Sequence, residues 1–238
     1  MQGRPPFKTV LAVPLHCQGC VNSVEKALSV IEGTINVECH LDSQLVEVEG
    51  TAAPSIISKV LAGIGKDCIL RGSGTPNSAA VCILETHAPN VKDPIRGLVR
   101  LVQVGEKFTI ADLSLKGLSP GVYQASIRQS GDISKGAAST GGVWEAGERD
   151  RGKLGQVDVD ETGSGGILFD SAIDIWEIIG RSLVVSRKTD DFQPDDDTTL
   201  VGVIARSAGV WENDKVVCSC SGKTVWEERT EQIGKGMI

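Results

Sequence analysis

The sequence predicts two domains of different fold class, an α+β domain and then an all-β domain, followed by a flexible C-terminal tail. Three observations lead to this prediction. Strand and helix patterns alternate through residues 1–72, and residues 73–78 have the composition of a linker. Short strand patterns divided by turns then fill residues 79–212, whereas residues 213–238 are polar and offer few core residues. A chain of 238 residues is long enough for both domains.

The first domain has the order β-α-β-β-α-β, which is the ferredoxin-like arrangement. Its elements are expected, in order, at residues 7–14, 19–33, 34–42, 43–50, 53–65 and 67–71. Apolar residues three or four positions apart give the first helix one buried face: Val21, Val24, Leu28 and Ile31. The next strand alternates, and its expected core face carries Ile35, Val37, Cys39 and Leu41.

The second domain is expected to be a β-sandwich or Greek-key barrel, because its strand patterns are short and separated by turns. The strand candidates lie at residues 80–86, 95–104, 107–118, 121–129 and 183–188. Residues 136–166 are rich in Gly, Ser, Asp and Glu, so long surface loops are expected there.

Composition limits the classes of partner. The net charge of −7 argues against nucleic acid as the main partner. No apolar run has the length of a membrane span, and the N-terminus lacks the layout of a signal peptide. We therefore expect a soluble protein of the cytoplasm.

Cysteines give the first functional signal, because four of the seven lie in two close pairs. Cys17 and Cys20 form a C-x-x-C pair in the loop that enters the first helix, where the helix N-terminus favours the thiolate. Thiolates are soft ligands, and a closed zinc site needs about four protein ligands. Only two are present unless His16 joins, which suits an open Cu(I) site. A thioredoxin-like redox pair is the alternative, although that fold has a different strand order.

Residues 8–71 resemble the heavy-metal-associated domain of copper chaperones, whose motif is M-x-C-x-x-C. Leu15 stands in the place of the Met, which in that family packs inward beneath the loop, and leucine is a near-isosteric replacement. Lys66 falls where such domains place a lysine near the metal loop. The resemblance implies that its ammonium offsets the negative charge of a Cu(I) bis-thiolate.

Most of residues 79–210 resemble copper/zinc superoxide dismutase, through stretches such as "GVYQASIRQSGD" and "IIGRSLVVSRKTDD". The positions of that family's metal ligands hold residues that are not ligands here: Ser126, Arg128, Val143, Lys153 and Ser186. The positions of its disulfide cysteines and guiding arginine are also changed, to Ala137, about Val201 and about Thr198. Of the three histidines, only His87 lies in this domain, so a histidine-built copper/zinc centre cannot form.

A ligand-free copy of a dimeric enzyme can present a similar interface to that enzyme. The stretch "LVGVIARSAGVWEN" resembles the dismutase's C-terminal dimer strand with an extension. The expected docking residues are Gly202, Val203, Ile204, Arg206 and Trp211. The expected partner is a dismutase subunit in a heterodimer, and a homodimer is a second expectation.

The second cysteine pair is the C-x-C of the tail. Residues two apart in an extended segment point to the same side, so Cys218 and Cys220 can share one Cu(I). Their Cα atoms would lie about 6.6 Å apart, near the upper limit for a disulfide. A disulfide there would be strained and therefore oxidising. The pair suits copper transfer or disulfide transfer.

The whole chain resembles the family of copper chaperones that serve superoxide dismutase, and the fungal members fit best. This resemblance implies a chain that carries Cu(I), docks on immature dismutase, inserts copper and promotes the dismutase disulfide. It also implies a cytoplasmic protein with a fraction in the mitochondrial intermembrane space. A thiol–disulfide oxidoreductase with incidental copper is the alternative, and the histidine count disfavours a fused dismutase.

The other cysteines and histidines have simpler interpretations. Cys39 and Cys82 are expected to be small core residues, with a disulfide from Cys39 to Cys68 as an alternative. His40 and His87 are expected at the surface.

Overall fold

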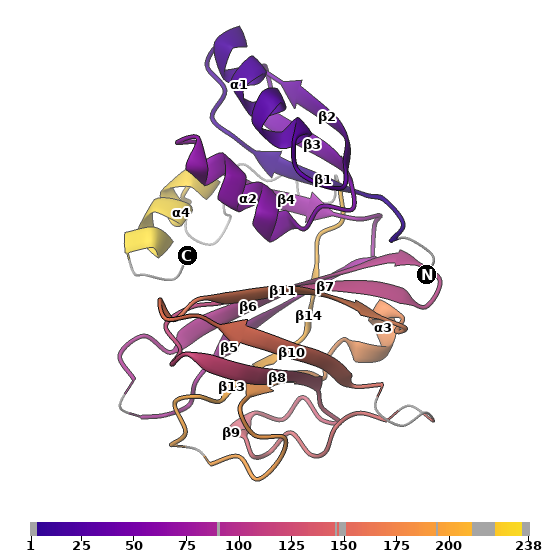
Figure 1. Ribbon diagram of the computed structural model, residues 1–238, viewed down its shortest axis with the longest axis vertical. Coiled ribbons are helices and arrows are strands. Elements are labelled where there is room, and N and C mark those ends of the chain that lie inside the picture. The colour runs from indigo at the N-terminus through magenta and orange to yellow at the C-terminus, as the bar shows by residue number, and fades with distance from the viewer. Residues whose placement is uncertain are drawn as a thin grey trace. The chain divides into compact units, whose positions relative to one another are not determined.

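The computed structural model describes residues 4–89, 91–145, 147, 151–193, 195–210 and 222–234, with the backbone alone for 232–234. The chain divides into two compact units. The first combines residues 1–79 with the described residues from 207 onward, and the second comprises residues 80–206. Figure 1 shows the elements of both.

The first unit contains the predicted ferredoxin-like domain. Its elements are β1 (Phe7–Ala12), α1 (Gln18–Ser29), β2 (Thr34–His40), β3 (Leu45–Gly50), α2 (Pro54–Gly63) and β4 (Ile69–Ser73). The four strands form an antiparallel sheet in the order β2-β3-β1-β4, and both helices cover one of its faces (Figure 1). The predicted order of elements is confirmed.

The helices form where the pattern predicts them. Val21, Val24 and Leu28 are the buried residues of α1, and they pack against the sheet with buried residues of β3 and α2. Pro54 begins α2, where a fixed φ suits the first turn and no backbone N–H is needed. Burial of this apolar stripe holds α1 on the sheet.

The predicted core face of β2 is only half correct. Val37 and Cys39 pack against the core, but Ile35 is 67% exposed. Strand β2 lies at the edge of the sheet, so the ends of this face extend beyond the helices that would cover them. Cys39 is a free cysteine, and the structure therefore does not contain the alternative disulfide to Cys68.

The predicted linker is tied to a distant segment of the first unit. The amide of Ser73 donates to the carbonyl of Ala208, and the amide of Val210 donates to that of Gly74. A Cβ atom on Gly72 would lie 2.1 Å from the carbonyl oxygen of Gly209, so only glycine permits this close approach. Residues 208–210 thus lie along the end of β4.

The second unit is the predicted Greek-key barrel. Its elements are β5 (Ala79–Glu85), β6 (Ile95–Gly105), β7 (Phe108–Leu115), β8 (Gly121–Ile127), β9 (Ser134–Ala137), β10 (Lys153–Val159), β11 (Gly165–Ser171), α3 (Ile175–Ile178), β12 (Ser182–Ser186), β13 (Leu200–Val203) and β14 (Ala205–Ser207). The sheet order is β13-β12-β8-β10-β11-β7-β6-β5-β14, and pairing of β13 with β5 closes eight strands into a barrel. The buried side chains line its interior.

The prediction of long surface loops in residues 136–166 is only partly correct. The described residues between β9 and β10 lie outside helices and strands, but β10 is a full barrel strand between β8 and β11. Val157 and Val159 enter the core from it. Gly155, which suggests a loop by composition, lies at φ +141° in a bulge of the pairing with β8. A Cβ there would lie 2.8 Å from the Phe169 ring, so the bulge requires glycine.

Two short helices were not predicted. Helix α3 begins with a capping box in which the side chains of Asp174 and Glu177 each bond the other's backbone N–H. Helix α4 (Val225–Gly234) lies within the segment expected to be a flexible tail. Among the described residues, no helix is both long enough and apolar enough to cross a membrane.

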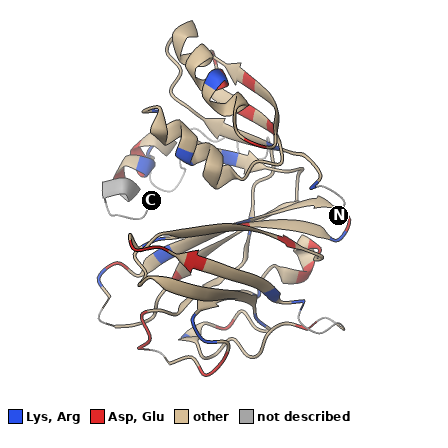
Figure 2. Cartoon of the chain, viewed as in Figure 1, with Lys and Arg blue, Asp and Glu red and all other residues tan. Residues whose placement is uncertain are grey.

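Charged residues are distributed over both units. Figure 2 shows Lys and Arg interspersed with Asp and Glu on the strands and loops of each. In this view the positively charged residues do not gather on one part of either unit.

Candidate metal site

The two thiols of the first pair lie at the start of helix α1. Cys17 is the N-cap residue in an extended conformation, and Cys20 is the third residue of the helix. The amides of Cys20 and Val21 both donate to the carbonyl of Cys17, which forms the first helical turn around the pair. Leu15, just before them, is 2% exposed and belongs to the core of the domain, as the resemblance implies. The buried side chain of Leu15 therefore anchors the loop to the core of the domain.

The geometry of the pair suits one bound ion. The Sγ atoms of Cys17 and Cys20 are 3.9 Å apart. Two sulfurs at this separation can both bond one ion at a metal–sulfur distance of about 2.3 Å. Cys17 is exposed and Cys20 half-buried, so the site is open to a partner. His16 is exposed beside them, as predicted.

Lys66 lies where the resemblance places it. Its Nζ donates to the Sγ of Cys20 at 3.2 Å and to the carbonyl oxygen of Pro14 at 3.3 Å. The second bond fixes the ammonium over the loop. A positive charge in this position offsets the negative charge that two thiolates and a monovalent ion would leave.

Electrostatics favour the thiolate of Cys20. A hydrogen bond from the backbone N–H of His16 and another from Lys66 lower the pKa of Cys20 to about 7. Burial has the opposite effect on two other cysteines and raises the pKa of Cys39 to about 11 and that of Cys82 to about 12. At neutral pH these two thiols stay protonated, which sets Cys20 apart. Cys82 is fully buried in the barrel core, as predicted.

In the barrel, Arg128 fills the region where the resemblance expects a copper ligand. Its side chain is 2% exposed and faces Val143, the position of the bridging ligand, across an isolated β-bridge. The guanidinium donates to the carbonyl oxygens of Gly141 and Thr189 and pairs with Asp190 at 2.9 Å. A buried cation held by three acceptors repels a metal ion.

At Ser186, another position where the resemblance expects a copper ligand, two hydroxyl groups form an uncharged contact. Ser186 is fully buried, and its hydroxyl lies 2.7 Å from that of Thr199. Ser126 pairs in the sheet with Lys153, the position of the zinc aspartate. The described residues at these positions thus offer hydroxyls and cations in place of imidazoles and carboxylates.

Comparisons with known proteins agree with both units. Residues 9–68 match the heavy-metal-associated domain, and residues 95–209 match copper/zinc superoxide dismutase. The superoxide dismutase 1 copper chaperone of Debaryomyces hansenii is 44% identical, over 97% of this chain and 98% of its own length. That of Saccharomyces cerevisiae is 41% identical, over 97% of each chain. The human copper chaperone for superoxide dismutase is 34% identical, over 94% of this chain and 90% of its own.

This chain belongs to the family of copper chaperones for superoxide dismutase. The family membership accounts for both matched domains in one chain.

The structure does not support two of the predicted docking residues. Gly202 and Ile204 are buried in the barrel and present no side chain to a partner. A Cβ on Gly202 would lie 1.9 Å from the carbonyl oxygen of Ile83. Val203 and Arg206 are exposed. Trp211, Cys218 and Cys220 lie outside the described residues.

Sequence reasoning missed three groups near the chaperone's thiols. Two of them are backbone groups, the His16 amide and the Pro14 carbonyl, and the residue types alone do not predict their hydrogen bonds. The third is Arg229 of α4, which pairs with Asp67 at 2.6 Å, directly after Lys66 in the chain. This ion pair lowers the pKa of Asp67. No sequence signal connects residues this far apart.

Replacing Lys66 with methionine is expected to raise the pKa of Cys20, because one of its hydrogen-bond donors and a positive charge are lost. The thiolate is populated above the pKa, so at pH 7 the alkylation rate of Cys20 should fall about three- to tenfold. Peptide mass spectrometry after iodoacetamide pulses across a pH series measures this rate. Lys59→Met, at an exposed position of α2, is the matched control. An unchanged rate in Lys66→Met would assign the effect to the His16 amide alone.

Proposed function

We propose that this chain carries Cu(I) on Cys17 and Cys20, docks on immature superoxide dismutase through its barrel, delivers the copper and promotes the dismutase disulfide through Cys218 and Cys220. The observation that carries the proposal is the sulfur pair 3.9 Å apart under the ammonium of Lys66. Copper is the cargo: it is transferred to the dismutase, and the chain is released without it.

The donor set supports the monovalent state of copper. Thiolates are soft donors, which select Cu(I) over harder ions, and Cu(I) tolerates two ligands. The exposed Cys17 lets a third sulfur from a partner approach. Exchange through such a shared intermediate needs no change in oxidation state, because one thiolate replaces another on the same ion.

The barrel supports docking without dismutase chemistry. With Arg128 buried at one ligand position and Ser186 at another, the described residues provide no imidazole pair for a redox copper. We therefore propose that the barrel has no dismutase activity and serves as a recognition domain. The folded barrel would offer the surface by which dismutase subunits recognise one another.

The exposed apolar surface near β13 is the candidate docking patch. Strand β13 pairs with β5, and on their outer side Val203 is 36% exposed and Ile83 54% exposed. Arg206 follows on β14, which also pairs with β5. Neighbouring apolar residues with an adjacent charge are typical of the core and rim of an interface.

Val203→Glu is expected to weaken binding of copper-free dismutase by at least about tenfold, because a carboxylate buried in the interface without a partner is costly. Copper loading of the first domain should not change. Ile167→Glu is the matched control, since Ile167 is 38% exposed on β11, four strands away in the sheet order. Sedimentation of the mixed proteins measures the complex. Unchanged binding by Val203→Glu would place the interface elsewhere, and equal weakening by both variants would show that the loss is not specific to this patch.

The tail would carry the redox step. A disulfide between Cys218 and Cys220 would be attacked by a thiolate of the dismutase, giving a mixed disulfide, and the second dismutase thiol would release the tail. The dismutase loses two electrons and two protons, and the tail leaves as a dithiol, so each further turnover needs reoxidation of the tail by an external oxidant such as oxygen.

A thiol–disulfide oxidoreductase with incidental copper is the alternative function, which the second cysteine pair favours. One reconstitution experiment distinguishes this alternative from the copper-chaperone function. The full chain, with or without Cu(I), is mixed with reduced, copper-free dismutase while metal, disulfide and complex size are followed together. A chaperone transfers metal within the complex, whereas disulfide formation at an equal rate without copper would support the alternative.

A further inference from the structure

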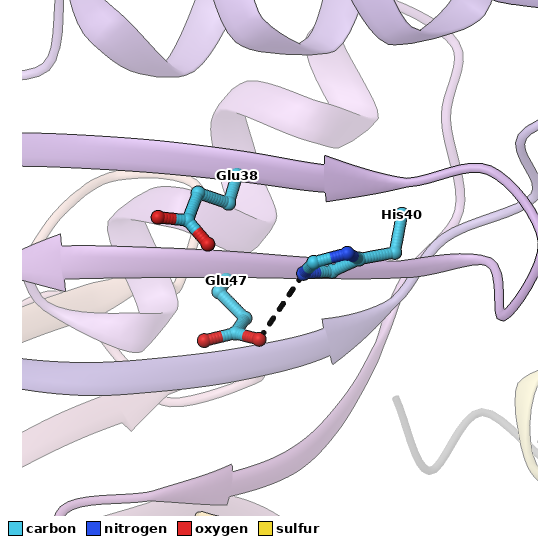
Figure 3. Close-up of side chains that lie close together, drawn as sticks. All are labelled: Glu38, His40 and Glu47. Atoms are coloured by element: carbon cyan, nitrogen blue, oxygen red, sulfur yellow. Dashed lines mark hydrogen bonds and ion pairs between the residues drawn. The ribbon is translucent and has the colours of Figure 1, made fainter.

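A cluster of side chains whose types can ligate a metal lies on the sheet of the first unit, and the cysteine pairs play no part in it. Glu38 and His40 come from β2 and Glu47 from β3, and one ligand atom from each lies within 4.8 Å of the others. Figure 3 shows the three side chains turned toward one another across the two strands. They alternate with Val37, Cys39, Val46 and Val48, which pack toward the helices, so the cluster is on the opposite face.

We propose that Glu38, His40 and Glu47 bind a divalent ion of the zinc class. Imidazole nitrogen and carboxylate oxygen are donors that suit Zn²⁺, whereas Cu(I) selects sulfur. The domain would thus sort two metals by donor type, with soft sulfur in the loop and harder donors on the sheet. Two carboxylates offset the two positive charges of the ion, and Lys8, which pairs with Glu47, adds one positive charge beside the site.

The distances in the cluster are close to those of a coordinated ion. In a tetrahedral site with bonds of about 2.0–2.2 Å, neighbouring ligand atoms lie about 3.3 Å apart. The Nε2 of His40 and the Oε1 of Glu47 are already 3.2 Å apart. Only Glu38, whose side chain is exposed, has to move inward. Solvent would supply the fourth ligand.

The surroundings hold the central ligand in place. Glu47 has a side chain only 10% exposed, and its second oxygen, Oε2, pairs with the Nζ of Lys8 at 3.2 Å. That contact leaves Oε1 toward the cluster. Asn36 donates to Glu38 at 2.9 Å. Partners of this kind orient ligating carboxylates in metal sites.

A like-charge contact gives an independent reason to expect a cation here. Glu38 and Glu47 are directly opposite each other in the β2–β3 register. Like charges at opposite positions destabilise an antiparallel pair. Lys8 pairs with Glu47 and also interacts electrostatically with Glu38, so it offsets only part of this repulsion. A divalent ion between the carboxylates would offset the repulsion.

Zinc titration of the full chain tests the proposal. The chain carries Cys17→Ser, Cys20→Ser, Cys218→Ser and Cys220→Ser, so that no thiol pair competes, and Zn²⁺ alone is the titrant in a calorimeter. We expect about one bound ion per chain and a first shell of oxygen and nitrogen, with imidazole, in zinc X-ray absorption. His40→Gln and Glu38→Gln should each weaken binding by about tenfold or more, since even indirect partners of a metal contribute that much.

Glu49→Gln is the matched control, because Glu49 is exposed on β3, two residues beyond Glu47, and is not part of the cluster. Its affinity for Zn²⁺ should stay within about twofold of the parent. His40 and Glu38 are exposed, so their variants should fold, and circular dichroism checks this. Absence of zinc binding, sulfur in the first shell, or equal affinity in the His40→Gln and Glu38→Gln variants would overturn the proposal.

Discussion

The double substitution Cys17→Ser plus Cys20→Ser is expected to remove Cu(I) from the first domain and to lower activation of dismutase at limiting copper by about tenfold or more. A serine hydroxyl is a hard donor that stays protonated at neutral pH, so it cannot replace a thiolate on Cu(I). Copper per chain is counted in a background of Cys218→Ser plus Cys220→Ser, because the tail thiols would otherwise bind copper themselves.

Activation is measured with the tail intact, so that loss of copper delivery is separated from loss of the tail. Cys39→Ser is the matched control, since this thiol has a raised pKa of about 11 and lies on β2, outside the loop. It should bind copper and activate dismutase normally. Undiminished copper binding by the Cys17 and Cys20 double variant would show that the loop is not the copper site.

The pH dependence of the same site has a definite sign. Because the pKa of Cys20 is lowered to about 7, its thiolate is present above that pH and is lost as the pH falls below it. Metal binding requires the thiolate, so protons compete with copper mainly below neutral pH. The affinity should therefore weaken as the pH falls through 7, and more steeply than in the range above it.

The first domain could be predicted from the sequence because its local signals agree with its fold. The three-and-four spacing in α1 places Val21 and Leu28 in the core, and Pro54 marks the start of α2. The exposure of Ile35 could not be predicted, because alternation shows which residues share a face but not how far the helices cover it. Burial at an edge strand depends on tertiary packing.

In the barrel, glycines account for most of the error. The composition around Gly155 predicts a loop, but this glycine provides the bulge that lets β10 pass the Phe169 ring. The resemblance predicts Gly202 as a docking residue, but Gly202 is buried because β5 approaches its backbone closely. A sequence shows that a glycine is present but not which close approach requires it.

The candidate site divides in the same way. The thiols and Lys66 could be predicted from motif and resemblance, and the structure brings Lys66 and Cys20 within 3.2 Å. The sequence could not predict that Arg128 fills the expected copper-ligand position. It does so through bonds to Gly141, Thr189 and Asp190, and these acceptors come from separate loops. The sequence shows that the imidazoles are missing, and the structure shows what replaces them.

The described segments on both sides of the tail cysteines belong to the first unit. Residues 208–210 bond to the end of β4, and Arg229 of α4 bonds to Asp67. Cys218 and Cys220 lie between these two segments in the sequence and outside the described residues.

Replacing either tail cysteine with serine is expected to block formation of the dismutase disulfide while docking and copper binding by the loop stay intact. Neither thiol can be spared, because the tail disulfide that the dismutase thiolate attacks needs both sulfurs. Cys218→Ser or Cys220→Ser should therefore leave the dismutase reduced. The parent chain should instead accumulate a covalent link, seen on non-reducing gels, to a dismutase in which one of the two thiols is replaced by serine. Ser219→Ala, between the two tail cysteines, is the matched control and should mature dismutase at the normal rate. If Cys218→Ser plus Cys220→Ser matures dismutase as fast as the parent, the tail is not the transfer site. The exposed thiol of Cys17, with the thiolate of Cys20 beside it, would then have to perform both steps.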